Sequence, residues 1–573
     1  MANFINTQNS FADGEISREF YTHDNLNGLS QLVNMDVMSG GGITRRPGLC
    51  AGAELPNVAR LVPFSVGADA EYMLAITDGH ILVFSGTQQI QDIAAPWPAD
   101  AIKSLQYAQR FGTMIFVHPD FQPRVFQSAA DGFTLSLFDF SRNDSDLSVN
   151  IPFVRFDDTD GIEITVTANS AGNNYATFTT NHDFWTSDDI GGRFIVLGRQ
   201  WTITSVTGPT VATAHTNGTF TLPAAAITDW RRRGQWSSTR RGWPVSITFH
   251  QDRLVFGGAR DYPAGVWMSQ VGRHNNFDVG TGLDDQAIFI TLLSAQRQQI
   301  CTVVSADNLQ ILTTVGEWAI ANKPLTPSSV DIKQHTSVGS VSSHYMPPQK
   351  IEGATVFVAA SMRDIRELAL DELGENYNAT DLCAYAKHLM QSPVDIAYNS
   401  AERQLFVVMA SGDMAVLNQN TALGISAWAQ YKTNGEFKSV AVSANKTFVV
   451  VARDGKYFLE YFSHDALCDA PAYNFSVVAA GVPLRGSGRN AARALIRKIA
   501  ARVCDTKSIL INDMRCVLPD EIYVASHSGF TGDVSVGALG WMNDCVVSPW
   551  RISSQDAAKI TVLSVTMYGY YTV

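Results

Sequence analysis

The chain repeats one pattern of hydrophobicity along much of its length, and this repetition constrains its fold more than any other feature. Each unit contains a short alternating run of apolar and polar residues, a polar turn, a hydrophobic run of four or five residues, a second turn and another alternating run. Such a unit predicts three or four antiparallel strands. The units begin at Val58, Ile102, Pro244, Ile300, Gln349, Pro393 and Phe437.

The spacing of these units indicates the kind of all-β fold. Successive units start 44, 142, 56, 49, 44 and 44 residues apart, and every step but one lies near the ~40 to 50 residues of a β-propeller blade. The dipeptides Asp78-Gly79, Gly412-Asp413 and Asp454-Gly455 suit hairpin turns, which need residues that tolerate positive φ. We therefore expect an all-β protein built on a β-propeller of about six to eight blades.

The one long step predicts an insertion. Subtracting a blade leaves roughly 100 residues, the size of a small domain. Residues 128–243 contain Thr- and Val-rich runs with strand alternation, so we expect a compact inserted β domain there. Its acidic run FDDTDG, residues 156–161, lacks the alternating ligands and the distant glutamate of a calcium loop and predicts a turn instead.

The remaining residues lie at the two ends of the chain. The repeats stop after Phe462, and residues 463–573 again contain strand-like runs. The simplest packing places residues 1–57 beside residues 463–573 as one domain, with propeller blades at residues 58–127 and 244–462. Several domains are expected in any case, because the 573 residues exceed the about 250 to 300 that one core supports.

Composition excludes some classes of protein. The 42 basic and 54 acidic residues give a net charge of −12, which does not fit a protein whose whole surface binds nucleic acid. Charged residues are 17% of the chain against a usual value of about 25%, which indicates surface hidden in an assembly. The N-terminus has no basic start and no apolar segment of a secretion signal, so synthesis in a cytosol is expected.

Motifs for chemistry are missing from the sequence. The seven cysteines form no Cys-x-x-Cys pair, and neither Gly-x-Ser-x-Gly nor His-Glu-x-x-His occurs. His118 and His250 stand in predicted blade hairpins without obvious partners and are interpreted as structural. We expect no catalytic, cofactor-binding or metal-binding residues, and therefore no enzyme.

An N-terminal segment combines three glycines with two arginines. The run GGGITRRPG contains Gly40, Gly41 and Gly42, followed by Arg45 and Arg46. Its spacing fits neither a P-loop nor a dinucleotide-binding fingerprint. It predicts a tight turn that leads into an extended Arg-Arg-Pro segment.

A second arginine-rich segment lies at the end of the predicted insertion. The run WRRRGQWSSTRRGW, residues 230–243, interleaves three tryptophans with Arg231, Arg232, Arg233, Arg240 and Arg241. Indoles and guanidinium groups in this mixture could stack on bases and neutralise phosphates. They could equally form a linker back to the propeller, with arginine stems packed on the indoles.

Several motifs, taken in order, resemble one protein family. The segment FADGEIS, residues 11–17, is followed by Asn34-Met35, by GGGITRRPG, and then by IKSLQYAQRFGTMIFVHPDFQPRVF, GQWSSTRRGWPVSITFHQDRLVFGGAR, TTVGEWAI, PLTPSSV and IRELAL. Their order over residues 10–462 resembles the tail nozzle proteins of short-tailed bacteriophages, also called tail tubular protein B or packaged-DNA stabilization proteins.

The resemblance implies a function, a location and partners. It implies a structural protein of the virion tail, assembled in the bacterial host cytoplasm as a homo-hexameric ring below the adaptor and portal proteins. Further implied partners are tail fibres or tail spikes, double-stranded DNA in transit through the channel and, transiently, the host envelope. Residues 1–57 and 463–573 would form an adaptor-facing platform, and the insertion a fibre dock or tip. The assembly interface would include Gly14, Glu15, Arg45, Arg46, Pro47 and Gly48.

Two other functional classes stay open. A virion-associated propeller enzyme acting on host glycans would need carboxylates clustered at the propeller axis. A host-receptor or tail-fibre-type binding protein would have long fibrous repeats, which this sequence lacks.

Overall fold

The computed structural model describes most of the chain. It covers residues 2–17, 27–67, 70–142, 149–150, 153–155, 161–168, 174–196, 199–217, 220, 225–228, 230–235, 241–321, 323–371, 374, 376–465, 475–479, 494–518, 529–542, 549–554 and 559–571. The turn expected at residues 156–161 lies outside these segments except for Gly161.

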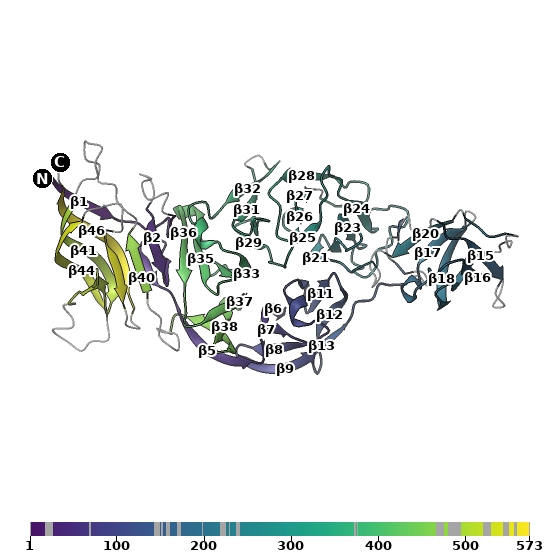
Figure 1. Ribbon diagram of the computed structural model, residues 1–573, viewed down its shortest axis with the longest axis horizontal. Coiled ribbons are helices and arrows are strands. Elements are labelled where there is room, and N and C mark those ends of the chain that lie inside the picture. The colour runs from purple at the N-terminus through teal and green to yellow at the C-terminus, as the bar shows by residue number, and fades with distance from the viewer. Residues whose placement is uncertain are drawn as a thin grey trace. The chain divides into compact units, whose positions relative to one another are not determined.

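Almost all regular structure is β (Figure 1). The chain divides into two compact units. One unit combines residues 1–94 with residues 346–573, and the other spans residues 95–345. The described helices are single turns, and none is long and apolar enough to cross a membrane. They are α1 (Ala99–Ile102), η2 (Ser187–Asp189), η3 (Lys387–Leu389) and η4 (Thr421–Leu423).

The unit of residues 95–345 contains three four-stranded antiparallel sheets in which chain neighbours pair. The hydrophobic run of each sequence repeat forms the second strand of a sheet, and in β26 every residue is buried. The fourth strand is more exposed, as in β28. The strands are β10 (Gln106–Arg110), β11 (Thr113–His118), β12 (Phe121–Ala129) and β13 (Gly132–Leu137); β21 (Ser246–His250), β22 (Arg253–Gly257), β23 (Gly265–Met268) and β24 (Ile288–Thr291); and β25 (Ile300–Ser305), β26 (Leu309–Thr313), β27 (Glu317–Ile320) and β28 (Ile332–Thr336).

The same unit holds a seven-stranded antiparallel sheet inserted between β13 and β21. Phe178, Phe194, Trp185, Trp201 and Trp230 fill its own hydrophobic core. In spatial order the strands are β14 (Phe153–Arg155), β20 (Trp230–Gln235), β17 (Arg193–Val196), β18 (Arg199–Gly208), β19 (Val211–His215), β16 (Tyr175–Thr180) and β15 (Ile164–Ala168).

The expected start of the insertion, residue 128, does not coincide with the end of the preceding blade. This residue lies inside β12, which pairs with β13 from Arg124↔Leu137 to Ala129↔Gly132. The blade therefore extends one strand beyond the expected boundary, because the polar turn before β13 is a hairpin and not a domain linker.

The other unit contains four further sets of four antiparallel strands. Three of these sets are separate sheets, and the set within residues 393–431 is part of a nine-stranded sheet. The last set takes its fourth strand, β5, from the N-terminal part of the chain, next to β39. The strands are β6 (Arg60–Val66), β7 (Ala70–Thr77), β8 (His80–Ser85) and β9 (Gln88–Ala94); β29 (Gln349–Ile351), β30 (Ala354–Val358), β31 (Ile365–Leu370) and β32 (Tyr377–Asp381); β33 (Pro393–Asn399), β34 (Gln404–Met409), β35 (Met414–Asn420) and β36 (Ile425–Tyr431); and β37 (Glu436–Ser443), β38 (Lys446–Arg453), β39 (Lys456–Ser463) and β5 (Gly48–Leu55).

Both ends of the chain contribute to a further domain of this unit, here called the end domain (β1–β4 and β40–β46). Its two sheets enclose one hydrophobic core. One sheet has the order β3 (Met35–Val37), β4 (Ile43–Arg45), β46 (Thr561–Tyr571), β41 (Ala494–Thr506) and β44 (Phe530–Met542), and β1 (Ala2–Gln8) also pairs with β46. The other sheet continues the blade β33–β36 with β2 (Leu29–Val33), β40 (Phe475–Ala479), β45 (Arg551–Ser554), β42 (Leu510–Ile511) and β43 (Met514–Arg515).

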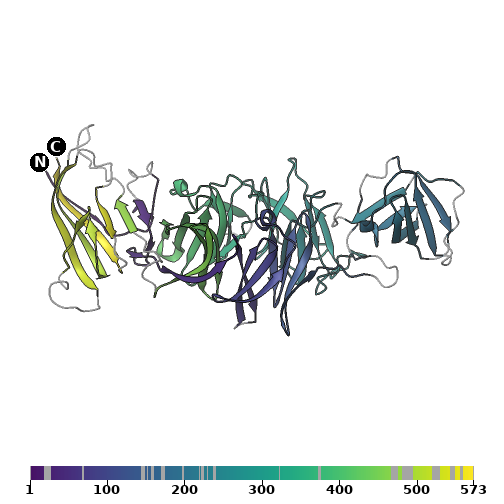
Figure 2. The same cartoon turned by 60° about the horizontal axis from the view of Figure 1, so that its bottom comes forward.

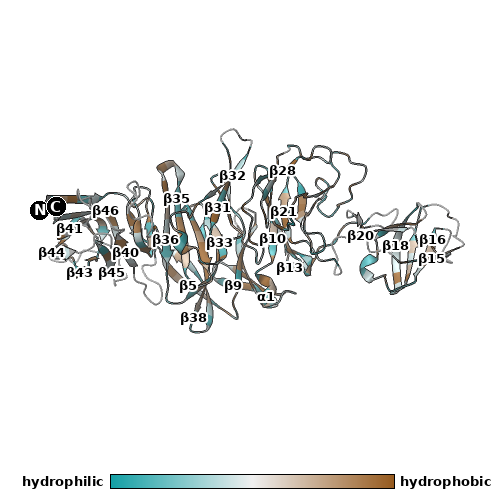
Figure 3. Ribbon diagram, turned by 45° about the horizontal axis from the view of Figure 1, so that its top comes forward, coloured by the Kyte–Doolittle hydropathy of each residue, from teal (hydrophilic) through white to brown (hydrophobic). Residues whose placement is uncertain are grey.

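The described segments thus contain seven four-stranded blades, of which the last includes β5 from the N-terminal part of the chain. Figure 2 shows these strands from a second direction. Hydrophobic and hydrophilic residues alternate along many of their strands (Figure 3), as expected for strands with one face toward a core. The predicted fold class, an all-β protein of the β-propeller type, is confirmed.

Candidate functional site at the junction of the end domain and a blade

The motif FADGEIS crosses from the end domain to the blade β33–β36. Gly14 forms a parallel bridge with Trp428, and the backbone N–H of Glu15 donates to the Trp428 carbonyl at 2.7 Å. Gly14 has φ +60°, and a Cβ at this position would lie 2.5 Å from the Trp428 carbonyl oxygen. Glycine is required here because the backbones of the two segments approach too closely for a side chain.

The Glu15 side chain makes polar contacts with three segments of the chain. It is buried, and Oε2 accepts a hydrogen bond from the Leu32 backbone N–H of β2 at 2.8 Å. Oε1 accepts from Gln430 Nε2 of β36 at 2.7 Å and lies 2.8 Å from His388 Nε2 of η3. Hydrogen bonds to an ionised carboxylate are about twice as strong as neutral ones, so this carboxylate fastens β2 to the blade.

The glycine triplet forms the turn of the hairpin β3–β4. The Met38 N–H donates to the Gly42 carbonyl at 2.7 Å, and Met35 to Val37 pair with Arg45 to Ile43. Gly41 has φ +80°, a conformation that glycine adopts without strain. The predicted tight turn is confirmed.

Arg46 lies inside the protomer. Its side chain is 2% exposed, and Nε donates to Asn34 Oδ1 at 2.9 Å. Nη1 donates to the Pro47 carbonyl at 2.7 Å and Nη2 to the Lys432 carbonyl at 3.1 Å. The guanidinium carbon lies 5.4 Å from the centroid of the Phe462 ring. Backbone and ring atoms of its own chain therefore surround this guanidinium group.

A buried carboxyl group lies in the same polar cluster. Asp36 accepts a hydrogen bond from the Tyr431 hydroxyl. Burial raises the pKa of Asp36 to about 6, although hydrogen bonds from Tyr431 and Gln404 and the charge of Arg46 act in the opposite direction. Burial likewise raises the pKa of Tyr431 well above its usual value. The cluster therefore holds a carboxyl group that keeps its proton to a higher pH than an exposed aspartate does.

The other residues of the GGGITRRPG motif continue the chain from the end domain into the propeller. The Arg45 side chain is buried, and its backbone N–H donates to the Ile560 carbonyl at 3.1 Å. Gly48 begins β5 and pairs with Ser463 of β39. Pro47 is half-buried between the two strands. Together with Gly14 and Glu15, these residues form a junction within one protomer; their expected part in contacts between copies stays a prediction.

The second arginine-rich segment is only partly described. Arg231, Arg232 and Arg233 lie in β20 opposite β17, and their side chains, like residue Arg240, lie outside the described structure. Arg241 Nη1 donates to Asp261 Oδ2 at 3.5 Å. Trp230 is buried in the core of the inserted sheet, and its Nε1 donates to the Ile162 carbonyl at 2.8 Å. This indole therefore stabilises the domain and is not available to stack on a base.

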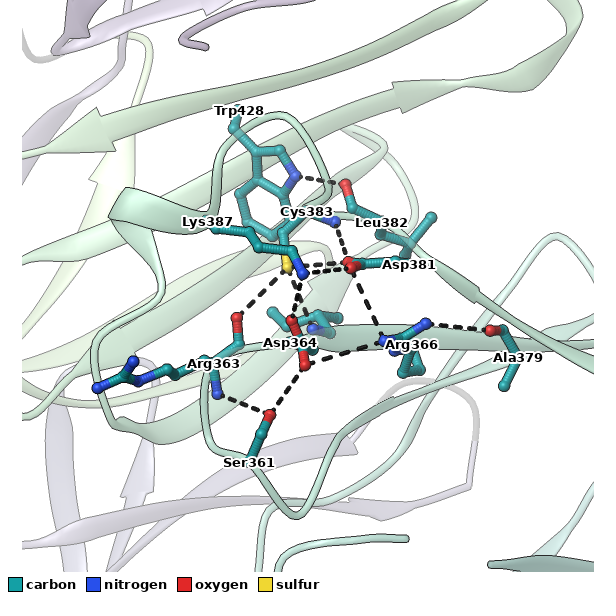
Figure 4. A network of polar contacts seen from close by, with 11 residues as sticks. Ser361, Arg363, Asp364, Arg366, Ala379, Asp381, Leu382, Cys383, Lys387 and Trp428 are labelled. Atoms are coloured by element: carbon teal, nitrogen blue, oxygen red, sulfur yellow. Dashed lines mark hydrogen bonds and ion pairs between the residues drawn. The ribbon is translucent and has the colours of Figure 1, made fainter. Parts of the chain in front are cut away.

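The structure brings together a cluster of polar side chains that sequence reasoning missed (Figure 4). Ligand atoms of Asp364, Asp381 and Cys383 lie within 4.8 Å of one another. The Lys387 ammonium lies 3.2 Å from a carboxylate oxygen of each aspartate, and Arg366 lies within 3.9 Å of both. No local spacing signals this cluster, because its residues come from the start of β31 and the residue before it, from the end of β32 and the turn after it, and from η3.

The ammonium group of Lys387 takes the place that a metal ion would need. Burial raises the pKa of Asp364, but hydrogen bonds from Ser361 and Lys387 outweigh that effect and leave the pKa below its usual value. Burial raises the pKa of the Cys383 thiol to about 12. The cluster fits a balanced ion-pair network better than a metal centre.

The two histidines singled out in the sequence have partners in the propeller. His118 Nδ1 accepts a hydrogen bond from the Asp120 backbone N–H at 3.1 Å, and burial lowers the pKa of His118. His250 Nδ1 lies 3.0 Å from Ser305 Oγ.

Comparison with known proteins adds only distant likenesses. No family model matches the chain, and no curated protein matches it. Solved structures that are similar include the computationally designed Ika8 protein, with 13% identity and a TM-score of 0.37 over 73% of this chain and 100% of that chain. The RRP9 WD40 repeats have 9% identity and a TM-score of 0.32 over 73% and 100%. BamB from Moraxella catarrhalis has 11% identity and a TM-score of 0.33 over 73% and 98%. Likenesses at this level say nothing about what the chain does.

Proposed function

We propose that the chain is a structural virion protein, the tail nozzle ring of a short-tailed bacteriophage. In this role it extends the channel of the adaptor and portal proteins, retains the packaged DNA and conducts the DNA during ejection. The proposal starts from the resemblance in motif order. One structural observation supports it: the two N-terminal motifs that carry the resemblance, FADGEIS and GGGITRRPG, both lie at the junction between the end domain and the propeller.

This junction suits a subunit of a ring. Glu15 binds β2 to β36, and Arg46 binds the segment after β4 to the carbonyl of Lys432, which follows β36. Buried, charge-assisted contacts of this kind hold two domains in one orientation. A nozzle needs such a fixed orientation, because every copy must place its propeller at the same position around the channel.

The charge of the chain also supports a channel for DNA. Each copy carries a net charge of −12. A surface that neutralises phosphates binds DNA and resists its movement, whereas a surface of like charge lets the duplex slide.

An enzyme acting on glycans is supported less well. Such a propeller needs two carboxyl groups that face a shared substrate site. The buried carboxylates of Glu15, Asp36 and Asp395 instead accept hydrogen bonds from their own chain; Asp395 Oδ2 accepts from Ser439 Oγ at 2.5 Å and from the Val440 N–H at 3.1 Å.

Electron microscopy and native mass spectrometry test the proposed function. The purified chain should form a closed ring, and an affinity tag on the inserted domain should be located at the tail end of phage particles that contain the chain. In parallel, the pure protein is incubated with host polysaccharide. A chain that stays monomeric, that is absent from the tail, or that cleaves the polysaccharide would contradict the nozzle role.

A further inference from the structure

The sheet of the end domain that contains both chain termini has two open edges. In the order β44, β41, β46 and β1, each strand is antiparallel to its neighbour. Within the described segments, β44 pairs only with β41, and β1 pairs only with β46. Each edge strand therefore presents one row of backbone N–H and C=O groups that no described strand binds.

The edges lack most features that usually prevent pairing with another chain, although β44 has register shifts outside Gly532–Gly537, the part that pairs regularly with β41. The strand β1 has the sequence ANFINTQ, without charge or proline. The strand β44, FTGDVSVGALGWM, has no proline, and its single charged residue, Asp533, is neutralised by Arg502 at 2.8 Å and 3.0 Å. Natural edge strands are commonly protected by lysine, proline or unpaired charge. Edges without such protection are suited to pairing in an assembly.

The two edges also present apolar side chains on the same face of the sheet. Ile5 of β1 is 69% exposed and Trp541 of β44 is 50% exposed. Cross-strand pairing aligns Ile5 with Tyr568 and Lys498, and aligns Trp541 with Leu495 and Tyr570 in the next outward-facing row. Both residues therefore stand on the outer face, at opposite edges.

The strand directions allow a second copy to continue this sheet. With four strands in strict antiparallel alternation, β1 and β44 of one copy run in opposite directions. A second copy in the same orientation therefore presents its β44 antiparallel to β1 of the first. When the rows of the second copy continue those of the first, Ile5 and the second copy's Trp541 lie in adjacent rows, within reach of an aromatic side chain.

We propose that copies of this chain join head to tail through the end domain, with β1 of one copy pairing antiparallel with β44 of the next. This contact rests on the proposed function in that a ring needs one repeated contact between copies. A head-to-tail contact uses two different surfaces and closes into a ring when the rotation between copies allows it.

Cysteine cross-linking tests the pairing directly. Thr7 and Ser535 lie in one row, separated by Thr566 and Ala500, which places them about 14 Å apart within a copy. A disulfide needs Cα atoms within about 7 Å, so a bond between these positions can form only between copies. Mild oxidation of mixed Thr7→Cys and Ser535→Cys proteins should give the 7–535 disulfide, identified by mass spectrometry. Neither variant alone should give a dimer through its new cysteine.

Charge substitutions provide a second test of the proposed pairing. Ile5→Lys and Trp541→Lys should each weaken self-association at least about tenfold, because a charge is then placed at the paired edge. Leu423→Lys, which changes an equally exposed residue of η4, is the matched control and should assemble normally. Circular dichroism checks that all three variants fold.

The outcomes separate this contact from the proposed function. A ring that assembles normally with Ile5→Lys and Trp541→Lys and forms no 7–535 disulfide would overturn the edge contact while leaving the nozzle ring. A disulfide in Thr7→Cys alone would show symmetric β1–β1 pairing and would also overturn it. A wild-type chain that stays monomeric would contradict ring formation itself.

Discussion

The guanidinium carbon of Arg46 lies 5.3 Å from the centroid of the Tyr431 ring. Tyr431 ends β36 and donates a hydrogen bond to Asp36 of β3. One stacked pair thus connects the hairpin of the end domain, the segment that leads to β5 and the last strand of a blade. The attachment of the end domain to the blade thus depends on the buried side chains of Arg46, Asp36 and Tyr431.

Arg46→Ala should lower the free energy of unfolding by about 3 kcal/mol, because it removes three hydrogen bonds and leaves Asp36 buried without its nearby positive charge. Denaturant unfolding followed by tryptophan fluorescence measures the change. The matched control is Arg110→Ala, which breaks a partly exposed ion pair with Asp252 and should cost less than about 1 kcal/mol. Equal losses of unfolding free energy in both variants would show that the contacts of Arg46 stabilise the fold no more than a partly exposed ion pair does.

Asp36 should make the stability of the protein depend on pH. Its pKa in the folded state, about 6, lies above the usual 3.8, so the folded state binds the proton more tightly than the unfolded state. The stabilisation is complete below the unfolded pKa and is lost as pH rises through the folded value. At 1.36 kcal/mol per pKa unit, about 2 kcal/mol should be lost between about pH 4 and pH 7.

Asp36→Asn cannot ionise and tests this assignment. The unfolding free energy of the variant, relative to wild type, should increase by about 2 kcal/mol between about pH 4 and pH 7. Urea titrations at several pH values give both curves. Parallel curves for the two proteins would show that another group causes the pH dependence.

Glu15→Gln should loosen β2 from the blade. The amide has one acceptor oxygen in place of two, and its NH₂ group would face the Leu32 N–H or the donors on Gln430 and His388. A loss of about 2 kcal/mol would speed local opening roughly 30-fold. Hydrogen exchange of the amides of Leu29–Val33 measures this opening. Glu436→Gln changes an exposed carboxylate and should leave these amides unchanged; faster exchange in both variants would contradict a specific role for Glu15.

Lys387→Ala should create a cation site. Without the ammonium group, Asp364 and Asp381 would face each other with only Arg366 nearby, and a divalent ion would relieve their repulsion. Zn²⁺ affinity, measured by calorimetry, should rise at least about tenfold above wild type. Arg363→Ala is the control, because Arg363 contributes only backbone groups to the network in Figure 4. Tight Zn²⁺ binding by wild type would contradict the ion-pair interpretation.

Deletion of the inserted sheet should be tolerated only if it leaves β13 intact. Replacing residues 153–235 with a short Gly/Ser linker should leave a soluble protein, since the sheet has its own core. Replacing residues 130–225 removes β13, whose buried Phe133 stacks on Phe126 at 5.5 Å, and should cause aggregation. Equal solubility of the two deletions would show that β13 is dispensable.

The repeated pattern in the sequence determined the fold class, because a buried strand needs a run such as LQILT and a hairpin needs residues such as Asp454-Gly455 wherever they occur. Those requirements are local, and they can be read along the chain. The glycine triplet likewise predicted its own turn, because positive φ at Gly41 is a property of a single residue.

Only the tertiary structure decided what Glu15, Arg46 and the Asp364 cluster do. Arg46 is buried because Asn34, Lys432 and Phe462, the last two about 400 positions away, supply the acceptors and the ring around it. The sequence does not distinguish an arginine whose guanidinium group faces water from one whose guanidinium group is buried in its own chain. Its environment is set by contacts between residues distant in sequence, and burial and pKa follow from that environment.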